Sequence, residues 1–187
     1  MTEDAEDIVV RAVGREDLMA VARLWVDMRL EEAGITNRRA SASELGSVYR
    51  LVARRFREPE RILLIAYLSR RAVGFYSGRI RGRVGGGLDL YVTAGARRRG
   101  VGRRLVEAAL ASYQERGADR IAGALRGSQA SHPFWASIWT ARPSHLLSTR
   151  EAAGVEWRTR SLASMAVNPD GGTQTGQGQP AGQSNSK

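Results

Sequence analysis

The segment from 88 to 110, with the sequence LDLYVTAGARRRGVGRRLVEAAL, constrains the possible folds of this chain more than any other. It begins with residues typical of a β-strand, passes through a loop rich in arginine and glycine, and continues with apolar residues at helical spacing. A helix of this kind has one apolar face to bury, and the sheet that contains the preceding strand is the nearest surface for it. The segment therefore indicates a mixed α/β domain.

The loop between this strand and this helix has the features of a phosphate-binding loop. The first N–H groups of a helix have no intrahelical acceptor and carry the positive end of the helix dipole. Gly100 and Gly102 have no Cβ, so an anion can approach the backbone closely there. Guanidinium groups pair well with phosphate. Five of them lie within eight positions: Arg97, Arg98, Arg99, Arg103 and Arg104.

Alternating and helical patterns predict the remaining elements. Gly34, Pro59 and Gly117 are expected to end helices, and Ser41 with Glu44 forms a capping-box pattern at a helix start. Strands are predicted over 7–13, 61–69, 72–84, 87–94, 119–125 and 155–167. Helices are predicted over 14–34, 41–58, 100–116 and 131–139. The three glycines at 85–87 are interpreted as a flexible connection, and residues 140–154 show no clear pattern.

The domain organisation follows from where the apolar patterns begin and end. Residues 1–7 are an acidic segment, residues 8–167 are predicted to form one domain, and 168–187 are predicted to be disordered because they contain almost nothing apolar. The chain has no cysteine, which excludes disulfides and thiolate metal sites, and we expect no metal. It has no long apolar run and its start is acidic rather than basic, so we expect a cytoplasmic protein without a membrane span.

The charge of the chain favours an anionic ligand or partner. The formal net charge is +10, and Lys187 is the only lysine, so nearly all of the basic residues are arginine. Such a surface suits a phosphorylated ligand, a nucleic acid or an acidic protein. A genome rich in G and C would also favour arginine codons, but that bias explains the cluster at 97–104 less well than it explains scattered arginines.

The spacing of the loop separates it from the common nucleotide-binding loops. The P-loop pattern needs a lysine that is absent here, and in the G-x-G-x-x-G pattern Leu105 stands at the third glycine. What fits is Arg97-x-x-Gly100-x-Gly102 between a strand and a helix. This pattern, with the order of elements from 8 to 167, resembles the coenzyme A loop of the GNAT acyltransferase superfamily.

The resemblance implies a fold, a co-substrate and a reaction. The implied fold is an α/β sandwich with a mixed, mostly antiparallel sheet of six to seven strands, splayed in the middle, with helices on both faces. The implied enzyme transfers an acetyl group from acetyl-CoA to the primary amine of a small molecule or protein, by direct attack in a ternary complex. The residues implied to contact the coenzyme are Tyr91, Val92, Thr93, Arg97, Arg98, Arg99, Gly100, Val101, Gly102, Arg103 and Ser128.

The resemblance also implies two catalytic groups on the strand before the loop. The backbone N–H of Val92 would polarise the thioester carbonyl and stabilise the oxyanion. Asp89 stands where a carboxylate often serves as the base that accepts the proton of the amine. The alternative for Asp89 is an ion pair with an arginine across the hairpin, namely Arg79, Arg81 or Arg83.

The match to the family is weaker on the side of the leaving thiolate. Trp135 stands at the position of the usual tyrosine, and an indole N–H does not give up its proton near neutral pH, so it cannot act as a general acid. Ser131, Ser128 and His132 are the nearby candidates for a donor, although His132 is more typical of a helix start. The missing tyrosine leaves open a coenzyme-binding protein of this fold without turnover.

The acceptor site is the least defined part. In the family it lies between the first two helices and the last strands, which directs attention to Trp25, Met28, Arg29 and Glu32. Trp25 and Met28 also fit core positions of a helix, and Glu31 and Glu32 fit a solvated helix end. A basic nucleic-acid-binding module is the alternative function, and a homodimer is possible.

Overall fold

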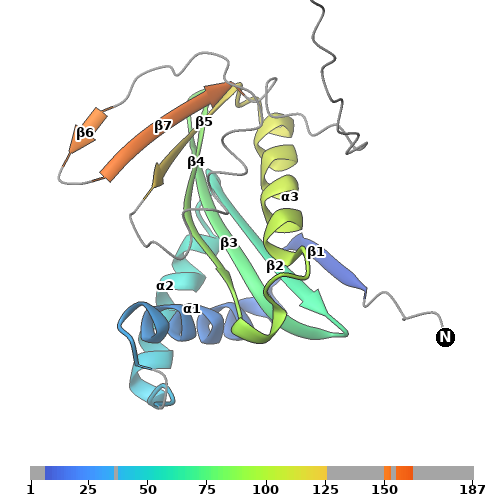
Figure 1. The fold of residues 1–187 in the computed structure, drawn as a ribbon, viewed down its shortest axis with the longest axis vertical. Coiled ribbons are helices and arrows are strands. Elements are labelled where there is room, and N and C mark those ends of the chain that lie inside the picture. The colour runs from blue at the N-terminus through green and yellow to red at the C-terminus, as the bar shows by residue number, and fades with distance from the viewer. Residues whose placement is uncertain (1–6, 36–37, 126–149, 153–154, 162–187) are drawn as a thin grey trace, which may run out of the picture.

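The computed structural model describes residues 7–35, 38–125, 150–152 and 155–161 of the 187-residue chain (Figure 1). Its strands are β1 (Ile8–Ala12), β2 (Arg61–Leu68), β3 (Arg71–Arg81), β4 (Val84–Val92), β5 (Arg120–Leu125), β6 (Arg150–Ala152) and β7 (Val155–Ser161). Its α-helices are α1 (Leu18–Glu32), α2 (Ala42–Phe56) and α3 (Val101–Glu115), and the short 3-10 helices are η1 (Arg15–Asp17) and η2 (Ala94–Ala96).

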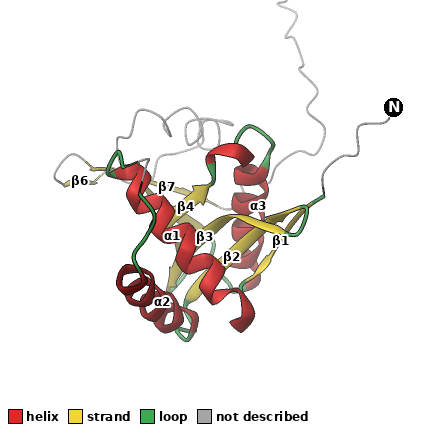
Figure 2. Cartoon of the chain, turned by 90° about the horizontal axis from the view of Figure 1, so that it is seen from below, coloured by secondary structure: helices red, strands yellow, loops and turns green. Residues whose placement is uncertain are grey.

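The described strands form one mixed sheet. The strand order is β1-β2-β3-β4-β5-β7-β6, and every neighbouring pair is antiparallel except β4 and β5, which run parallel. The helices lie on both faces, with α3 on one side and α1 and α2 on the other (Figures 1 and 2). The predicted fold class, a mostly antiparallel mixed sheet between helices, is confirmed.

The parallel pair β4–β5 separates along its length. The two strands are in register only from Val84 to Gly87 of β4, which pair with Arg120 to Gly123 of β5. Beyond this point β4 continues along β3 as far as Val92, while β5 continues along β7. Among the described strands, β4 therefore has a partner on only one edge from residue 88 to 92.

Two apolar cores hold the helices on the sheet. Helix α3 buries one apolar stripe against one face, with Val101, Leu105 and Tyr113 each 1% exposed or less. Helices α1 and α2 cover the other face, where Trp25 stacks on Phe75 of β3 with ring centroids 4.9 Å apart. Consecutive residues of β4 point to opposite faces, so Leu90 and Val92 pack toward α3 and Tyr91 packs toward α1.

The predicted helix boundaries are confirmed at the ends that had a specific signal. The hydroxyl of Ser41 accepts a hydrogen bond from the N–H of Glu44 at 3.2 Å, and the carboxylate of Glu44 accepts one from the N–H of Ser41 at 2.8 Å. The Arg38 guanidinium, together with Ser41, lowers the pKa of Glu44 to about 2. Gly34 and Gly117 follow α1 and α3 in the left-handed conformation, with φ of 71° and 79°.

The prediction for the glycines at 85–87 was wrong. They are strand residues of β4, and the turn between β3 and β4 is at Gly82, which has a φ of 58°. The ring of Tyr113 lies where a side chain at Gly85 would project, so a larger residue does not fit at that place. The turn after β2 is likewise one residue earlier than predicted, at Ser69 and Arg70.

Several predictions fall outside the described residues, including the helix over 131–139 and the disorder over 168–187. The segment 140–154, which showed no clear pattern, ends in β6. Among the helices that the structure describes, none combines the length and the apolar character needed to cross a bilayer.

Candidate functional site

The arginine–glycine loop is a short, well-anchored connection between η2 and α3. Ala96 and Val101, on either side of it, are 2% and 1% exposed, so both ends of the loop are fixed in the core beside α3. Between them the backbone turns sharply, with left-handed φ angles of 64° at Arg98 and 83° at Gly100. Glycine adopts such an angle without strain, which explains why Gly100 stands at the residue that caps α3.

The start of α3 presents unpaired backbone donors. The N–H groups of Ala96 and Arg97 donate to Thr93 and Ala94, and the first bond within the helix runs from Arg104 N–H to Gly100 O at 3.1 Å. The N–H groups of Val101, Gly102 and Arg103 therefore have no intrahelical acceptor. The first turn contains no acidic residue, so the helix dipole and the local charge both favour an anion.

Arg97, the first residue of the motif, connects the loop to α1. Its Nε donates to the carbonyl oxygen of Val92 at 2.9 Å, and its Nη2 lies 2.6 Å from both carboxylate oxygens of Glu31. The guanidinium also lies 5.9 Å from the ring centroid of Tyr91, whose hydroxyl donates to Glu31 at 3.3 Å. Burial, followed by the charge of Glu31, raises the pKa of Tyr91 to about 12.

Glu31 is the residue of this group that the sequence did not identify. It was interpreted, with Glu32, as a solvated end of α1, and nothing in the helical pattern distinguishes the two. Only the packing of α1 across β4 places Glu31, rather than Glu32, against the loop.

The backbone of Val92 points to the edge of β4 that β5 has left. The N–H of Thr93 donates to Val73 O on β3 at 2.8 Å. Backbone groups of successive strand residues point to opposite edges, so those of Val92 point away from β3. The carbonyl oxygen of Val92 agrees with this, because it accepts from Arg97 rather than from β3.

Asp89 forms an ion pair, but with none of the arginines considered from the sequence. Its Oδ2 accepts from Nη1 of Arg55, on α2, at 3.2 Å. Arg79 pairs instead with Glu60 at 3.0 Å, and Arg83 pairs with Asp119 at 2.8 Å. The side chains of Asp89 and Arg55 are 24% and 19% exposed, so the pair is largely withdrawn from water.

Arg55 is held by more than its carboxylate partner. Its guanidinium lies 4.5 Å from the ring centroid of Trp25, and Nη1 is 3.5 Å from the hydroxyl of Ser77. Burial lowers the pKa of Arg55, and the charge of Asp89 acts in the opposite direction. No local pattern distinguishes Arg55 from the other arginines of α2, so sequence reasoning did not select it.

The four residues proposed for the acceptor are not equivalent. Trp25 and Met28 are 2% and 8% exposed and belong to the core between α1 and the sheet, which was the alternative considered for them. Glu32 is exposed at the end of α1. Arg29 is exposed on α1 and lines a cavity.

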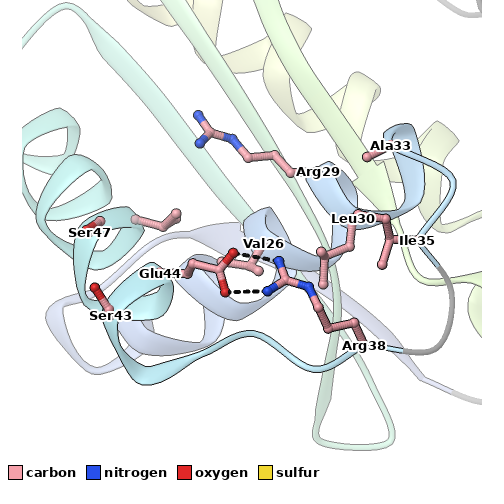
Figure 3. Close-up of a pocket in the computed structure, with 10 residues that line it drawn as sticks. Val26, Arg29, Leu30, Ala33, Ile35, Arg38, Ser43, Glu44 and Ser47 are labelled. Atoms are coloured by element: carbon pink, nitrogen blue, oxygen red, sulfur yellow. Dashed lines mark hydrogen bonds and ion pairs between the residues drawn. The ribbon is translucent and has the colours of Figure 1, made fainter.

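That cavity lies between the end of α1 and the start of α2 and has a volume of about 390 Å³ (Figure 3). Arg38 and Glu44 form an ion pair at its wall, with a nitrogen–oxygen distance of 2.6 Å (Figure 3). The guanidinium of Arg29 forms no hydrogen bond or ion pair with another described side chain, although its carbonyl oxygen accepts from the N–H of Ala33 at 3.1 Å. The lining residues are Val26, Arg29, Leu30, Ala33, Ile35, Arg38, Ser43, Glu44, Ser47 and Val48.

The candidates on the side of the leaving group, Ser128, Ser131, His132 and Trp135, lie outside the described residues. Within the part of the chain that the structure describes, no group of three or more histidine, aspartate or glutamate side chains could hold a metal ion.

Comparison with known proteins identifies the family. Residues 17–138, more than half of the chain, match the acetyltransferase (GNAT) family. The chain belongs to this family, and it is therefore an acyltransferase by family and by fold. A search of curated proteins finds no match.

Solved structures of acetyltransferases share the fold at low identity. An acetyltransferase from Thermus thermophilus is 16% identical with a TM-score of 0.61, covering 82% of this chain and 96% of the other. The PaiA N-acetyltransferase from Thermoplasma acidophilum, solved with coenzyme A, is 17% identical with a TM-score of 0.58, covering 83% and 99%. The ribosomal-protein-S18-alanine N-acetyltransferase from Escherichia coli is 13% identical with a TM-score of 0.58, covering 83% and 94%.

Proposed function

We propose that this protein transfers an acetyl group from acetyl-CoA to the primary amine of a small molecule or a protein, by direct attack in a ternary complex. The observation that carries the proposal is the separation of β4 from β5 directly before the arginine–glycine loop. Among the described residues, a strand edge without a partner and a helix start without intrahelical acceptors then lie at the two ends of one short segment, from Leu88 to Arg103. A cytoplasmic site of action is part of the proposal.

The residues of the loop fit a diphosphate. The N–H groups of Val101, Gly102 and Arg103 are available for its oxygens, and the arginines of the loop supply positive charge. A Cβ built on Gly100 would meet no atom of the described residues within 4 Å apart from its own stretch of backbone, so its outer side is open rather than packed there. Acetyl-CoA, when bound, supplies the activated thioester that the reaction needs.

The catalytic roles belong to two groups on β4. The carboxylate of Asp89 accepts a proton from the acceptor ammonium, which leaves a neutral amine that can attack the thioester carbon. The N–H of Val92 donates to the carbonyl oxygen as it becomes an oxyanion. The new C–N bond forms and the C–S bond breaks with its electron pair on sulfur. The nitrogen, which is positively charged after the attack, loses a second proton, and this proton balances the one that the thiolate gains. Asp89 releases the first proton to solvent before the next cycle.

The test is acetyl-CoA binding followed by turnover. Acetyl-CoA should raise the melting temperature of the protein, and the Gly100→Asp variant should lose this shift because it places a carboxylate at the phosphate site. Gly117→Asp is the matched control, since Gly117 has a similar φ of 79° at the other end of α3. It introduces a comparable strain and the same charge, and it should keep the shift.

Turnover is measured as the release of free thiol with a panel of polyamines, amino acids, aminoglycosides and basic peptides. If acetyl-CoA binds but no amine gives thiol release, the protein is a coenzyme-binding member of the fold without turnover. If acetyl-CoA at millimolar concentration produces no shift, the proposal is wrong. Retention on RNA that falls steeply with salt would then favour the nucleic-acid alternative, which is weakened here because many described arginines are in ion pairs with acids.

A further inference from the structure

The position of Asp89 relative to the sheet gives it a special place among the described carboxylates. It lies two residues after Gly87, the last residue of β4 that pairs with β5. It is opposite Ser77 of β3, where the register of the hairpin shifts by one residue. Its side chain is on the face covered by α1 and α2, because it contacts Arg55 and because Tyr91, two residues on, packs there.

Arg55 reaches Asp89 from the helix layer that covers this face of the sheet, because Arg55 is on α2 and Asp89 is on β4. The contact joins residues 34 positions apart in the sequence, and the guanidinium is fixed by Trp25 on its flat face and by Ser77 beside it. Ser77 and Trp25 are themselves 0% and 2% exposed, so neither can move far. The arginine is thus held in one orientation by side chains of α1 and β3.

The contact uses only one of the two oxygens of the carboxylate. Nη1 of Arg55 binds Oδ2 of Asp89, and among the described residues Oδ1 has no hydrogen-bond partner. A carboxylate with one oxygen fixed cannot rotate freely about its terminal bond. Its second oxygen then points in a defined direction with acceptor capacity to spare.

Stability is a poor explanation for this pair. Removing two charges from water has a large desolvation cost, and apolar residues of similar volume often stabilise a protein as well or better. Aromatic rings pack on one side of the pair, since Trp25, Phe75 and Tyr91 follow one another with centroid separations of 4.9 and 6.4 Å. Burial and the charge of Arg61 both lower the pKa of Arg55, so they disfavour a second arginine here. An ion pair at the point where β4 and β5 separate is therefore better explained by a role in the reaction than by a contribution to stability.

We propose that Arg55 is a positioning residue that holds Oδ2 of Asp89, so that Oδ1 is presented to the ammonium group of the acceptor. The inference rests on the proposed function, because it assigns a partner to the base of that reaction. The proton moves from the acceptor nitrogen to Oδ1, and Arg55 keeps all of its own protons throughout. In this role Arg55 acts through Asp89 rather than on the reacting atoms themselves.

The experiment is a double-mutant cycle on turnover with Arg55→Gln, Asp89→Asn and the double variant. Each is assayed for kcat by thiol release and for the Kd of acetyl-CoA by calorimetry. We expect Asp89→Asn to lower kcat about 100-fold, as loss of a general base does, and Arg55→Gln to lower it on the order of tenfold. On the Asp89→Asn background, Arg55→Gln should cause no further loss, and every variant should bind acetyl-CoA as the wild type does.

Arg54→Gln is the matched control, because Arg54 is the neighbouring arginine of α2 and is exposed; its kcat should be unchanged. If Arg55→Gln does not fold, Arg55→Lys replaces it, since lysine keeps the charge and the apolar stem over Trp25. The loss with Arg55→Lys should again vanish on the Asp89→Asn background.

Three results would overturn the inference. The first is an unchanged kcat in the Arg55 variants, and the second is an equal loss on both backgrounds, which would indicate a general structural effect. The third is a wild type that binds acetyl-CoA but releases no thiol with any amine, because Asp89 would then not act as a base and Arg55 would have no base to position. The proposed function fails separately, when the wild type does not bind acetyl-CoA at all.

Discussion

The buried carboxylate of Asp17 joins three separate parts of the chain, namely β1, the loop before η1 and β2. Asp17 is 2% exposed and accepts hydrogen bonds from the N–H of Gly14 at 2.7 Å, from the hydroxyl of Tyr67, and from both terminal nitrogens of Arg11. Burial raises the pKa of Asp17, but the bonds from Tyr67, Arg11 and Gly14 outweigh it and leave the pKa below its ordinary value. Burial and the bond to Asp17 raise the pKa of Tyr67 to about 12.

Replacement of Asp17 by asparagine should therefore destabilise the protein in a pH-dependent way. At pH 7 we expect a loss of about 1–3 kcal/mol in the free energy of unfolding, since buried donors lose a charged acceptor. The folded-state pKa lies below the ordinary value of 3.8, so this contribution is present above about pH 4 and is lost as the pH falls through the folded pKa. The difference in the free energy of unfolding is measured by urea unfolding of both proteins between roughly pH 3 and pH 7, a range that includes the titration of an ordinary carboxylate.

Glu16→Gln is the control, because Glu16 also lies near Arg11, at 3.5 Å, but is 69% exposed. Exposed pairs contribute little, so its effect should stay below about 0.5 kcal/mol at any pH. A difference for Asp17→Asn that does not shrink at low pH would mean that the carboxylate acts through its shape rather than its charge.

Single residues were also where sequence reasoning was least complete. The pattern could identify Asp89 as a carboxylate near the site, but not Arg55 as its partner. That pairing depends on the angle at which α2 crosses the sheet, and no local pattern specifies such an angle. Glu31 is a similar case, because its neighbour Glu32 has the same residue type and the same place at a helix end.

At the scale of the element, β4 shows how local composition can mislead. Three glycines in a row are typical of a flexible connection, yet here they are part of a strand. The hydroxyl of Tyr113 donates to the carbonyl oxygen of Gly86 at 2.7 Å and lies 3.2 Å from the hydroxyl of Tyr76. The glycines are thus explained by the ring that α3 places over them, which only the tertiary structure reveals.

The Gly85→Ala variant tests this explanation. A Cβ at this position would lie 2.5 to 2.8 Å from three ring atoms of Tyr113, which is itself 0% exposed and cannot move away into solvent. Overpacking of this kind should lower the free energy of unfolding by about 1–3 kcal/mol, measured by urea unfolding. Gly46→Ala, on α2, meets nothing closer than 3.8 Å and should instead stabilise the protein by about 0.5–1 kcal/mol. A neutral Gly85→Ala would show that α3 can shift.

The elements with periodic patterns were predictable for a physical reason. Helices α2 and α3 each bury one stripe, and α1 buries a wider face because it packs on both the sheet and α2. The helix ends have explicit signals in Ser41, Gly34 and Gly117. The strands β1, β2, β3 and β5 have bounds within a few residues of the prediction, because each is an apolar or alternating run between turn residues. The loop before α3 was predictable because Gly100 needs a left-handed angle that few other residues adopt.

At the scale of the whole molecule, the separation of β4 from β5 could be expected only from the resemblance to the GNAT family. Strand pairing is a property of two distant segments, and the residues of β4 and β5 contain no mark of where they part. The splay matters because it turns a continuous sheet into a sheet with an interior edge. The arginine–glycine loop lies at the end of that edge, so positive charge and backbone donors are gathered in one region of the protein.

The net charge of +10 should therefore strengthen the binding of acetyl-CoA through long-range electrostatic attraction. Acetyl-CoA is an anion, and screening shortens the range of its attraction to the protein from about 10 Å at 0.1 M salt to about 3 Å at 1 M. We expect the Kd of acetyl-CoA, measured by calorimetry, to rise on the order of tenfold between 50 and 500 mM sodium chloride, which corresponds to roughly 1.4 kcal/mol. The matched probe is an uncharged acetyl thioester of pantetheine, whose KM should not change with salt because it has no phosphate for the loop to bind. A Kd of acetyl-CoA that is flat over this range would mean that backbone donors at the start of α3 supply nearly all of the binding, and that the five arginines of the loop serve another partner.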